Sequence, residues 1–319
     1  MIWCTVIFLT VSILYFVGGY VIVRRTCVRR QERIEDFEHL FSKRRLALAS
    51  PSQLREDFDW FDSHRSRELC TLSYDGLRLF GTLIEAPKEA QTKGVVILFH
   101  GYRSTPRRDF CIQMRLLHEA GYHLLAVNQR SHSRSEGKYI CYGIKERYDV
   151  ITWRKLAAEI FGAETPVALM GLSMGAATVL MASELVDKED TALRCVVADC
   201  PFSSASNIIK YVMKDHNKVP LSKILFTATE FWARTLADLT FSSPSSAQAL
   251  ANSHLPALLI HGEEDDYVPI SHSEEIEGAS SGRARLVRIA NAKHSEAIYN
   301  DKKRYADELL SFLDLNMKY

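Results

Sequence analysis

The sequence predicts an α/β fold with a mostly parallel, doubly wound sheet, preceded by a membrane helix. Three observations predict it. From residue 68 onward, short apolar runs alternate with helical patterns, which is typical of βαβ units with right-handed crossovers. Polar side chains stand directly after several of these runs, at the strand ends where such sheets carry their chemistry. The first apolar stretch of the chain, in contrast, is long enough to cross a bilayer.

The composition is that of a globular protein. Of the 319 residues, 47% are hydrophobic and 25% are charged, which argues against wholesale disorder and against a polytopic membrane protein. The chain has 40 Lys and Arg against 39 Asp and Glu, which leaves a formal charge of +1. Its net charge therefore creates no strong positive potential that would attract nucleic acid. The seven cysteines form no C-x-x-C pair, and we interpret them as buried thiols in a reducing compartment rather than as zinc ligands or a disulfide framework.

The N-terminal segment from Ile2 to Val23 contains no charged side chain. A helix of these 22 residues spans the roughly 30 Å hydrocarbon core of a bilayer. A secretory signal peptide is the alternative, but no Lys or Arg precedes the run, and bulky residues stand where cleavage needs small ones. We therefore expect residues 1–23 to be a retained transmembrane anchor.

Several arginines follow the anchor directly. They are Arg24, Arg25, Arg29, Arg30 and Arg33. Because basic residues beside a span tend to stay in the cytoplasm, we expect a single-pass protein with a cytoplasmic catalytic domain, and an extracytoplasmic one as the alternative. The charged residues 24–67 form the linker to that domain, and the apolar spacing from Phe37 to Leu48 predicts one or two amphipathic helices in it.

The elements of the catalytic domain, residues 68–319, follow from apolar periodicity. Leu69–Ala86 predicts a β-hairpin, because Asp75-Gly76 supplies the positive φ of a tight turn. The all-apolar run at 95–99 predicts a strand buried on both faces of the sheet, and similar runs predict strands at 124–127, 167–170, 196–198, 258–260 and 286–289. Helical spacing predicts helices at 109–120, 145–161, 174–187 and 296–314.

A nucleophile pattern, G-x-S-x-G, stands between a predicted strand and a predicted helix. It comprises Gly171-Leu172-Ser173-Met174-Gly175. A sharp strand-to-helix turn holds such a serine in strained backbone geometry, and side chains at the two glycine positions would collide. A packing turn with an idle serine is the alternative. The placement favours Ser173 as a catalytic nucleophile.

A serine hydroxyl becomes a nucleophile when a base takes its proton and an acid orients that base. His294 follows the last predicted strand, where a loop can reach back over Ser173, and we interpret it as the base. Asp265 follows the strand before it and is the first candidate for the acid. Asp199, at the end of an earlier strand, is the second candidate.

The order of nucleophile, acid and base along the chain is that of α/β-hydrolases. Residues from about 68 to 315 resemble this superfamily, in its serine-esterase and S33 serine aminopeptidase-like branch. His261–Pro269 matches the pattern H-G-x-x-D-x-x-V-P, which assigns the acid role to Asp265 rather than to Asp266.

The resemblance also implies an oxyanion hole of two backbone N–H groups. Met174, which follows the nucleophile, supplies one of them. The H-G-x pattern that begins at His100 assigns the other to Tyr102. We interpret His100 itself as a residue that fixes this loop, with a catalytic role as the alternative.

Two further segments are interpreted from the resemblance. Residues 128–137 resemble the superfamily's D-x-R-G-H-G-x-S loop but depart from it at Asn128, Ser131 and Ser133. Residues 202–253 separate two strands by more than a usual loop, which implies a small helical cap over the active site. Its aromatic residues either line an acyl pocket or pack the cap on the body.

These features together predict a membrane-anchored serine hydrolase that cleaves carboxylic esters through a Ser-His-Asp triad and an acyl-enzyme. Its partner would be a small-molecule ester or peptide substrate. Neither a dinucleotide motif, a P-loop nor a metalloprotease motif occurs, so we expect no cofactor and no metal. A serine peptidase or acyltransferase with the same triad is the alternative among enzymes, and a non-catalytic binding module is the alternative outside them.

Overall fold

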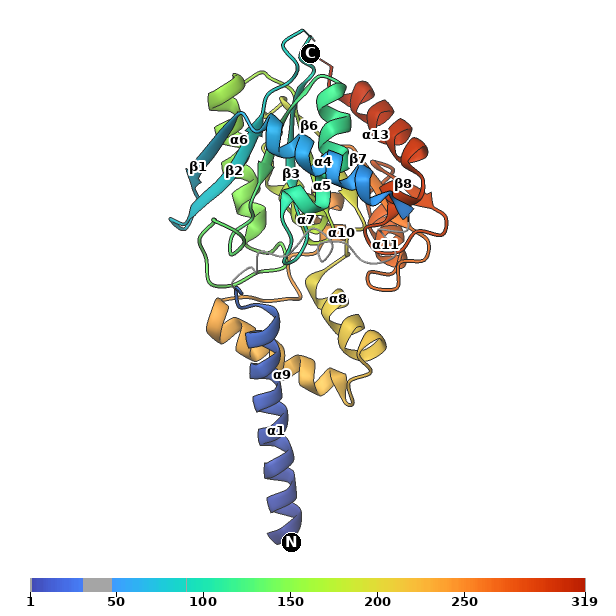
Figure 1. The fold of residues 1–319 in the computed structure, drawn as a ribbon. Helices are drawn as coiled ribbons and strands as arrows, with labels where there is room; N and C mark the ends of the chain where they lie inside the picture. Colours follow the sequence, from blue (N-terminus) through green and yellow to red (C-terminus); the bar gives the residue numbers. More distant parts are fainter. Residues whose placement is uncertain (1, 31–47, 90, 319) are drawn as a thin grey trace.

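The structure, a computed structural model, describes residues 2–30, 48–89 and 91–318 (Figure 1). An eight-stranded sheet with the order β1-β2-β4-β3-β5-β6-β7-β8 lies at its centre. All pairs from β4 to β8 are parallel, whereas β1 and β2 are antiparallel additions at one edge. The strands are β1 (Arg67–Leu72), β2 (Arg78–Ile84), β3 (Gly94–Phe99), β4 (Tyr122–Val127), β5 (Val167–Leu172), β6 (Leu193–Asp199), β7 (Ala257–Gly262) and β8 (Ala284–Ile289).

Helices cover both faces of this sheet, as a doubly wound topology requires (Figure 1). On one face lie α4 (Pro51–His64), α5 (Pro106–Glu119), α12 (Ala297–Asn300) and α13 (Lys302–Asn316). On the other lie α6 (Glu146–Phe161), α7 (Met174–Ala182), α10 (Ser246–Asn252) and α11 (Ser271–Ala279). The remaining helices are α1 (Ile2–Thr26), the 3-10 turn η1 (Ser183–Leu185), α8 (Ala205–Tyr211), the π-turn η2 (Val212–His216) and α9 (Ser222–Ala237).

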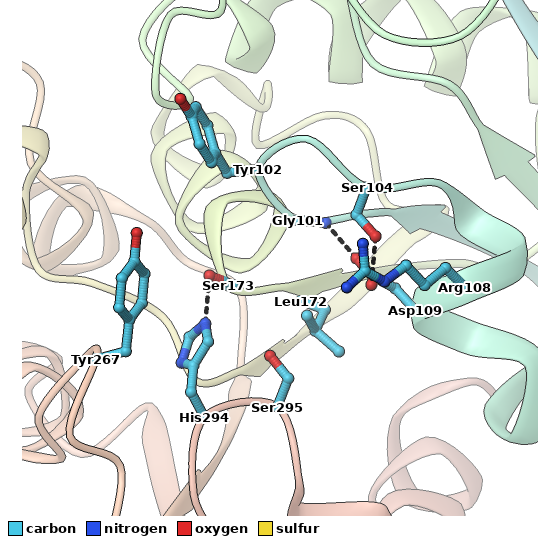
Figure 2. Close-up of a pocket in the computed structure, with 10 residues that line it drawn as sticks. All are labelled: Gly101, Tyr102, Ser104, Arg108, Asp109, Leu172, Ser173, Tyr267, His294 and Ser295. Atoms are coloured by element: carbon cyan, nitrogen blue, oxygen red, sulfur yellow. Dashed lines mark hydrogen bonds between the residues drawn. The ribbon is translucent and has the colours of Figure 1, made fainter. Parts of the chain in front are cut away.

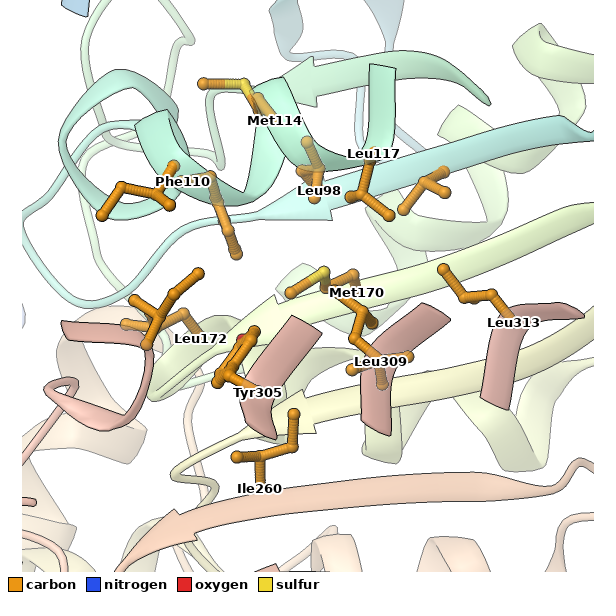
Figure 3. Packing of buried hydrophobic residues seen from close by; sticks show 14 of the residues in the cluster. Leu98, Phe110, Met114, Leu117, Met170, Leu172, Ile260, Tyr305, Leu309 and Leu313 are labelled. Carbon is orange, nitrogen blue, oxygen red and sulfur yellow. The ribbon is translucent and has the colours of Figure 1, made fainter. Parts of the chain in front are cut away.

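The core sits in two layers because side chains of a strand alternate between the faces of the sheet. In β3, Val96 and Leu98 belong to the layer under α5 and α13, and Ile97 belongs to the layer under α6 and α7. Figure 3 shows the first layer, where Leu98 and Met170 of the strands face side chains of the two helices. Burial on both faces explains the all-apolar runs in the sequence.

The predicted fold class, the hairpin and the six further strands are confirmed, although β8, at the edge of the sheet, is only partly buried. Two helices differ from the prediction. The helix predicted at 174–187 ends at Ala182 and continues as the 3-10 turn. The helix predicted at 296–314 is split, because the Asp301 side chain accepts a hydrogen bond from the Arg304 N–H and begins α13.

The predicted linker is described only in part. Its apolar spacing from Phe37 to Leu46 lies outside the described residues. Within the described part, α4 buries Leu54 and Phe58 against α5, so this segment packs on the catalytic body.

The segment predicted as a cap, residues 202–253, has two parts. α8, η2 and α9 project from the carboxyl edge of the sheet, whereas α10 packs on α7 and α11 as an ordinary crossover helix (Figure 1). The C-terminal half of α1 packs along α9. Gly19 makes this possible, since a Cβ there would lie 2.6 Å from the backbone of Ala228. The N-terminal half of α1 extends away from the body (Figure 1).

Candidate active site

Ser173 stands alone between the end of β5 and the start of α7, at φ 53° and ψ −112°. This backbone conformation is strained for a residue with a side chain. Both flanking glycines are required for it. A Cβ at Gly175 would lie 1.8 Å from the carbonyl oxygen of Phe99, and one at Gly171 would lie 2.2 Å from that of Gly175. The packing therefore enforces the sharp strand-to-helix elbow that the glycine spacing predicts.

Three side chains from three strand ends form one hydrogen-bonded line. The Ser173 hydroxyl, after β5, lies 3.0 Å from Nε2 of His294, after β8 (Figure 2). The Nδ1 of His294 lies 2.7 Å from Oδ2 of Asp265, after β7. Neutral imidazole carries one N–H, and the carboxylate can only accept it, so Nδ1 donates and Nε2 is left to accept from the serine. This is the arrangement of nucleophile, base and orienting acid.

Asp265 is buried yet ionised. Burial raises the pKa of its carboxyl, but the neighbouring His294 and His261 and the hydrogen bonds to them hold that pKa well below its usual range. The second oxygen, Oδ1, accepts the backbone N–H groups of Tyr267 and Val268 at 3.0 and 2.8 Å. A carboxylate fixed on both oxygens keeps its charge and its orientation toward the imidazole.

The other two carboxyls considered for the acid role have different partners. Asp199 is buried at the end of β6 and accepts a hydrogen bond from the Tyr305 hydroxyl at 2.8 Å. Asp266 is exposed and forms an ion pair with Lys293 at 3.2 Å. The structure thus brings Asp265 to His294, in the position that the H-G-x-x-D pattern assigns to the acid.

The loop after β3 lies beside the elbow because Phe99 pairs with Gly171 in the sheet. His100 in this loop is fully buried, and burial lowers the pKa of its imidazole to about 4. Its Nε2 accepts the Gln129 N–H, so its Nδ1–H donates to the carbonyl of Gly101. A neutral imidazole with both nitrogens engaged fixes the loop and is a poor proton carrier at neutral pH.

Tyr102 and Ser173 line one pocket of about 240 Å³ (Figure 2). In the part of the chain that the structure describes, the backbone N–H groups of Tyr102 and Met174 donate to no other residue. The Gly101 N–H, in contrast, donates to Asp109 at 2.7 Å. The two donors expected for an oxyanion hole therefore stay available beside the serine.

Sequence reasoning missed three residues of this pocket. Asp109, in the first turn of α5, accepts from Gly101 and from the Ser104 hydroxyl and so fixes the oxyanion loop. Arg108 lines the same pocket. The ring of Tyr267 lies 5.2 Å from that of His294. An acidic residue in a first helical turn is a weak sequence signal for Asp109, since such residues usually complement the helix dipole.

Ligand atoms of Cys200, Asp265 and His294 lie within 4.8 Å of one another, close enough to surround a metal ion. Metal ligation needs a thiolate and a free carboxylate. Burial and the nearby Asp199 raise the pKa of the Cys200 thiol well above its usual range, and Asp265 is already bonded to His294. A protonated thiol and an engaged carboxylate do not fit a metal ion.

The loop over residues 128–137 is fixed by a buried arginine. The guanidinium of Arg130 makes paired hydrogen bonds to Asp149 in α6, at 2.6 and 2.7 Å, and further ones to Asp75 in the hairpin turn. Ser131 and Ser133, which stand where the resembled loop has glycine, have φ values of 64° and 46°. The departures therefore change the residue type while the glycine-like backbone is kept.

Comparisons with known proteins agree with this fold. Residues 96–308 match the model of the alpha/beta hydrolase family. The chain is 25% identical over 225 residues to the uncharacterized protein YqkD of Bacillus subtilis, across 70% of this chain and 72% of that one.

Two solved structures share the fold. An esterase of Pyrococcus furiosus, Pf2001, superposes with a TM-score of 0.67 at 20% identity, over 91% of this chain and 98% of its own. The acylaminoacyl peptidase of Pyrococcus horikoshii superposes with a TM-score of 0.60 at 18% identity, over 79% of this chain and 42% of its own. With the family model matched over most of the catalytic body, this chain belongs to the α/β-hydrolase family.

Proposed function

We propose that this protein is a membrane-anchored serine hydrolase that cleaves carboxylic esters through an acyl-enzyme on Ser173. The observation that carries the proposal is the hydrogen-bonded line from Ser173 through His294 to Asp265, which starts at a strained elbow. An idle scaffold has no physical need for all three groups in this geometry. Membership of the α/β-hydrolase family supports hydrolysis as the reaction class.

The proposed reaction runs in two halves. The Ser173 oxygen attacks the ester carbonyl while His294 Nε2 takes its proton, and Asp265 stabilises the imidazolium that forms. The carbonyl oxygen becomes an oxyanion, which the N–H groups of Tyr102 and Met174 would hold. His294 then returns the proton to the leaving alcohol. Water, deprotonated by the same imidazole, releases the acid and restores the serine.

We also propose the division of the chain. Residues 1–23 are the transmembrane anchor, 24–67 the linker and 68–319 the catalytic domain. Among the described residues, α1 is the one helix long and apolar enough to cross a membrane, and only 12% of its most apolar part is buried. An apolar helix that is left uncovered by its own protein is typical of a lipid-facing segment. The arginines after it favour the cytoplasmic side for the catalytic domain.

The first prediction tests the nucleophile and its acid. We expect Ser173→Ala to abolish both hydrolysis of p-nitrophenyl esters and labelling by a fluorophosphonate probe. Asp265→Asn should lower kcat by about 10³- to 10⁴-fold, because the asparagine cannot hold the imidazole in the required tautomer. Asp266→Asn is the matched control, and we expect it to change kcat little, since Asp266 contacts Lys293 and not His294.

Wild-type turnover by the alanine variant would contradict the nucleophile. Equal losses at Asp265 and Asp266 would contradict the acid. The same assay with p-nitroanilides addresses the peptidase alternative, which faster cleavage of the amide than of the matched ester would favour.

A further inference from the structure

A second cavity, of about 220 Å³, adjoins the reaction pocket. Its walls are mostly apolar and include Ile208 and Met213 of the cap and Phe241 of the segment after α9. Tyr102 and Tyr267 line both cavities, so the two meet beside the serine and the histidine (Figure 2). The volume is below the ~300–1,000 Å³ of drug-sized sites, which suits a slim part of a ligand.

The end of α1 forms one wall of this apolar cavity, through Ile22, Arg25 and Thr26. This wall is fixed to the oxyanion loop. The Tyr102 hydroxyl donates to the carbonyl of Thr26 at 2.7 Å, and the guanidinium of Arg103 donates to the carbonyls of Arg25 and Val28. The residues that directly follow the proposed membrane anchor are therefore in contact with the loop that would hold the oxyanion.

The outer side of α9 continues the apolar surface of α1. The ring of Phe16 lies 4.8 Å from that of Trp232 and 5.1 Å from that of Phe231. Leu221, Ile224 and Phe231 are exposed. Tryptophan and other apolar side chains of this kind collect where a protein meets the bilayer interface. If α1 spans the membrane, the cap lies against the lipid and the apolar cavity lies at the membrane surface.

We propose that the apolar cavity binds the unbranched acyl chain of an ester dissolved in the bilayer. The end of the anchor helix is then part of the substrate site as well as a tether. An acyl chain that fills this cavity ends at Tyr102 and Tyr267, with its carbonyl beside Ser173. This substrate class rests on the ester hydrolysis proposed above.

The second prediction tests this pocket in the full-length protein reconstituted in phosphatidylcholine vesicles. Ile22→Trp places an indole in the cavity, whereas Val21→Trp, one residue earlier, places it on the exposed face of α1. We expect Ile22→Trp to lower the ratio of kcat/KM on p-nitrophenyl dodecanoate to that on p-nitrophenyl acetate by at least about tenfold. Losing two buried methylene groups suffices for a change of that size. Val21→Trp should leave the ratio unchanged.

Met213→Trp fills the cavity from the cap side and should lower the same ratio, so the test does not depend on one variant folding. Turnover of the dodecanoate should also follow its surface density in the vesicles. An unchanged ratio in both cavity variants, an equal loss on both esters, or turnover that follows bulk concentration alone would overturn the proposal. Failure of the proposed hydrolysis would look different, as neither ester would be cleaved by the unaltered chain.

Discussion

At the scale of single residues, two buried aspartates show how position decides chemistry. Asp265 and Asp199 both stand at the carboxyl end of a strand of the sheet, yet the first is bonded to an imidazole and the second accepts a hydrogen bond from a phenol hydroxyl. Burial raises the pKa of both carboxyls, and only Asp265 has neighbours that overcome this effect. Both residues were candidates because each stands at a strand end, and only the family pattern H-G-x-x-D favoured Asp265 over Asp199.

The third prediction concerns Asp199, whose pKa burial raises from 3.8 to about 6. Between about pH 4 and pH 6, the folded protein keeps this proton whereas the unfolded chain has lost it. The contribution of Asp199 to the free energy of unfolding is therefore complete below about pH 4 and is lost as the pH rises through about 6. Asp199→Asn cannot ionise, and we expect it to remove this loss. Relative to wild type, its free energy of unfolding should rise by up to about 3 kcal/mol between acidic and neutral pH.

Denaturant unfolding of both proteins across this pH range measures the effect. Asp266→Asn is the control, because that carboxylate is exposed, and its curve should run parallel to that of wild type. If the curve for Asp199→Asn also ran parallel to that of wild type, the raised pKa of Asp199 would be contradicted.

At the scale of elements, the loop over residues 128–137 keeps a glycine-like backbone without glycine at two positions. Non-glycine residues with positive φ cost about 1–2 kcal/mol each. Arg130 and its two carboxylate partners fix the loop firmly enough to hold Ser131 and Ser133 in this conformation. The two serines that depart from the family pattern therefore strain the backbone locally, and the ion pairs of Arg130 compensate for this strain.

The fourth prediction follows from that strain. Ser133→Gly should raise the free energy of unfolding by about 0.5–1 kcal/mol, because glycine adopts positive φ freely and this gain exceeds its entropic cost. Ser63→Gly within α4 is the matched control and should lower stability by about 0.5 kcal/mol. Destabilisation by Ser133→Gly would show that the backbone there is unstrained.

The elements also show which parts of the fold the sequence could predict. The six strands after the hairpin and the elbow were predicted because each leaves a local signal, a short apolar run or a glycine pair. α11 was missed because its nine residues carry only Ile276 as a large buried apolar side chain. The contact of α1 with α9 could not be predicted, since an apolar run shows that a helix is buried or lipid-facing but not against which surface it packs.

At the scale of the whole molecule, the first helix packs on the cap, and the residues that follow it bond to a loop of the catalytic body. Beyond α1, Val28 pairs with Tyr139 as an isolated bridge, and the Cys27 carbonyl accepts the Ile140 N–H at 2.6 Å. The Arg29 guanidinium donates to the carbonyl of Ser135 in the same region. These contacts hold the catalytic body close to the end of α1, so the position of the proposed anchor determines where the active site lies relative to the bilayer.

The fifth prediction concerns membrane insertion and orientation. Transfer of an apolar helix of this length into lipid is effectively irreversible, so alkaline carbonate should leave the full-length protein in the membrane pellet. Release into the supernatant would contradict the anchor. The basic residues after the helix, among them Arg24, Arg25 and Arg30, favour the cytoplasmic side. Protease added to intact cells should therefore spare the fluorophosphonate-labelled domain, and the same protease should destroy it after permeabilisation. Loss of the labelled domain in intact cells would reverse the orientation and place the acyl cavity at the outer surface of the membrane.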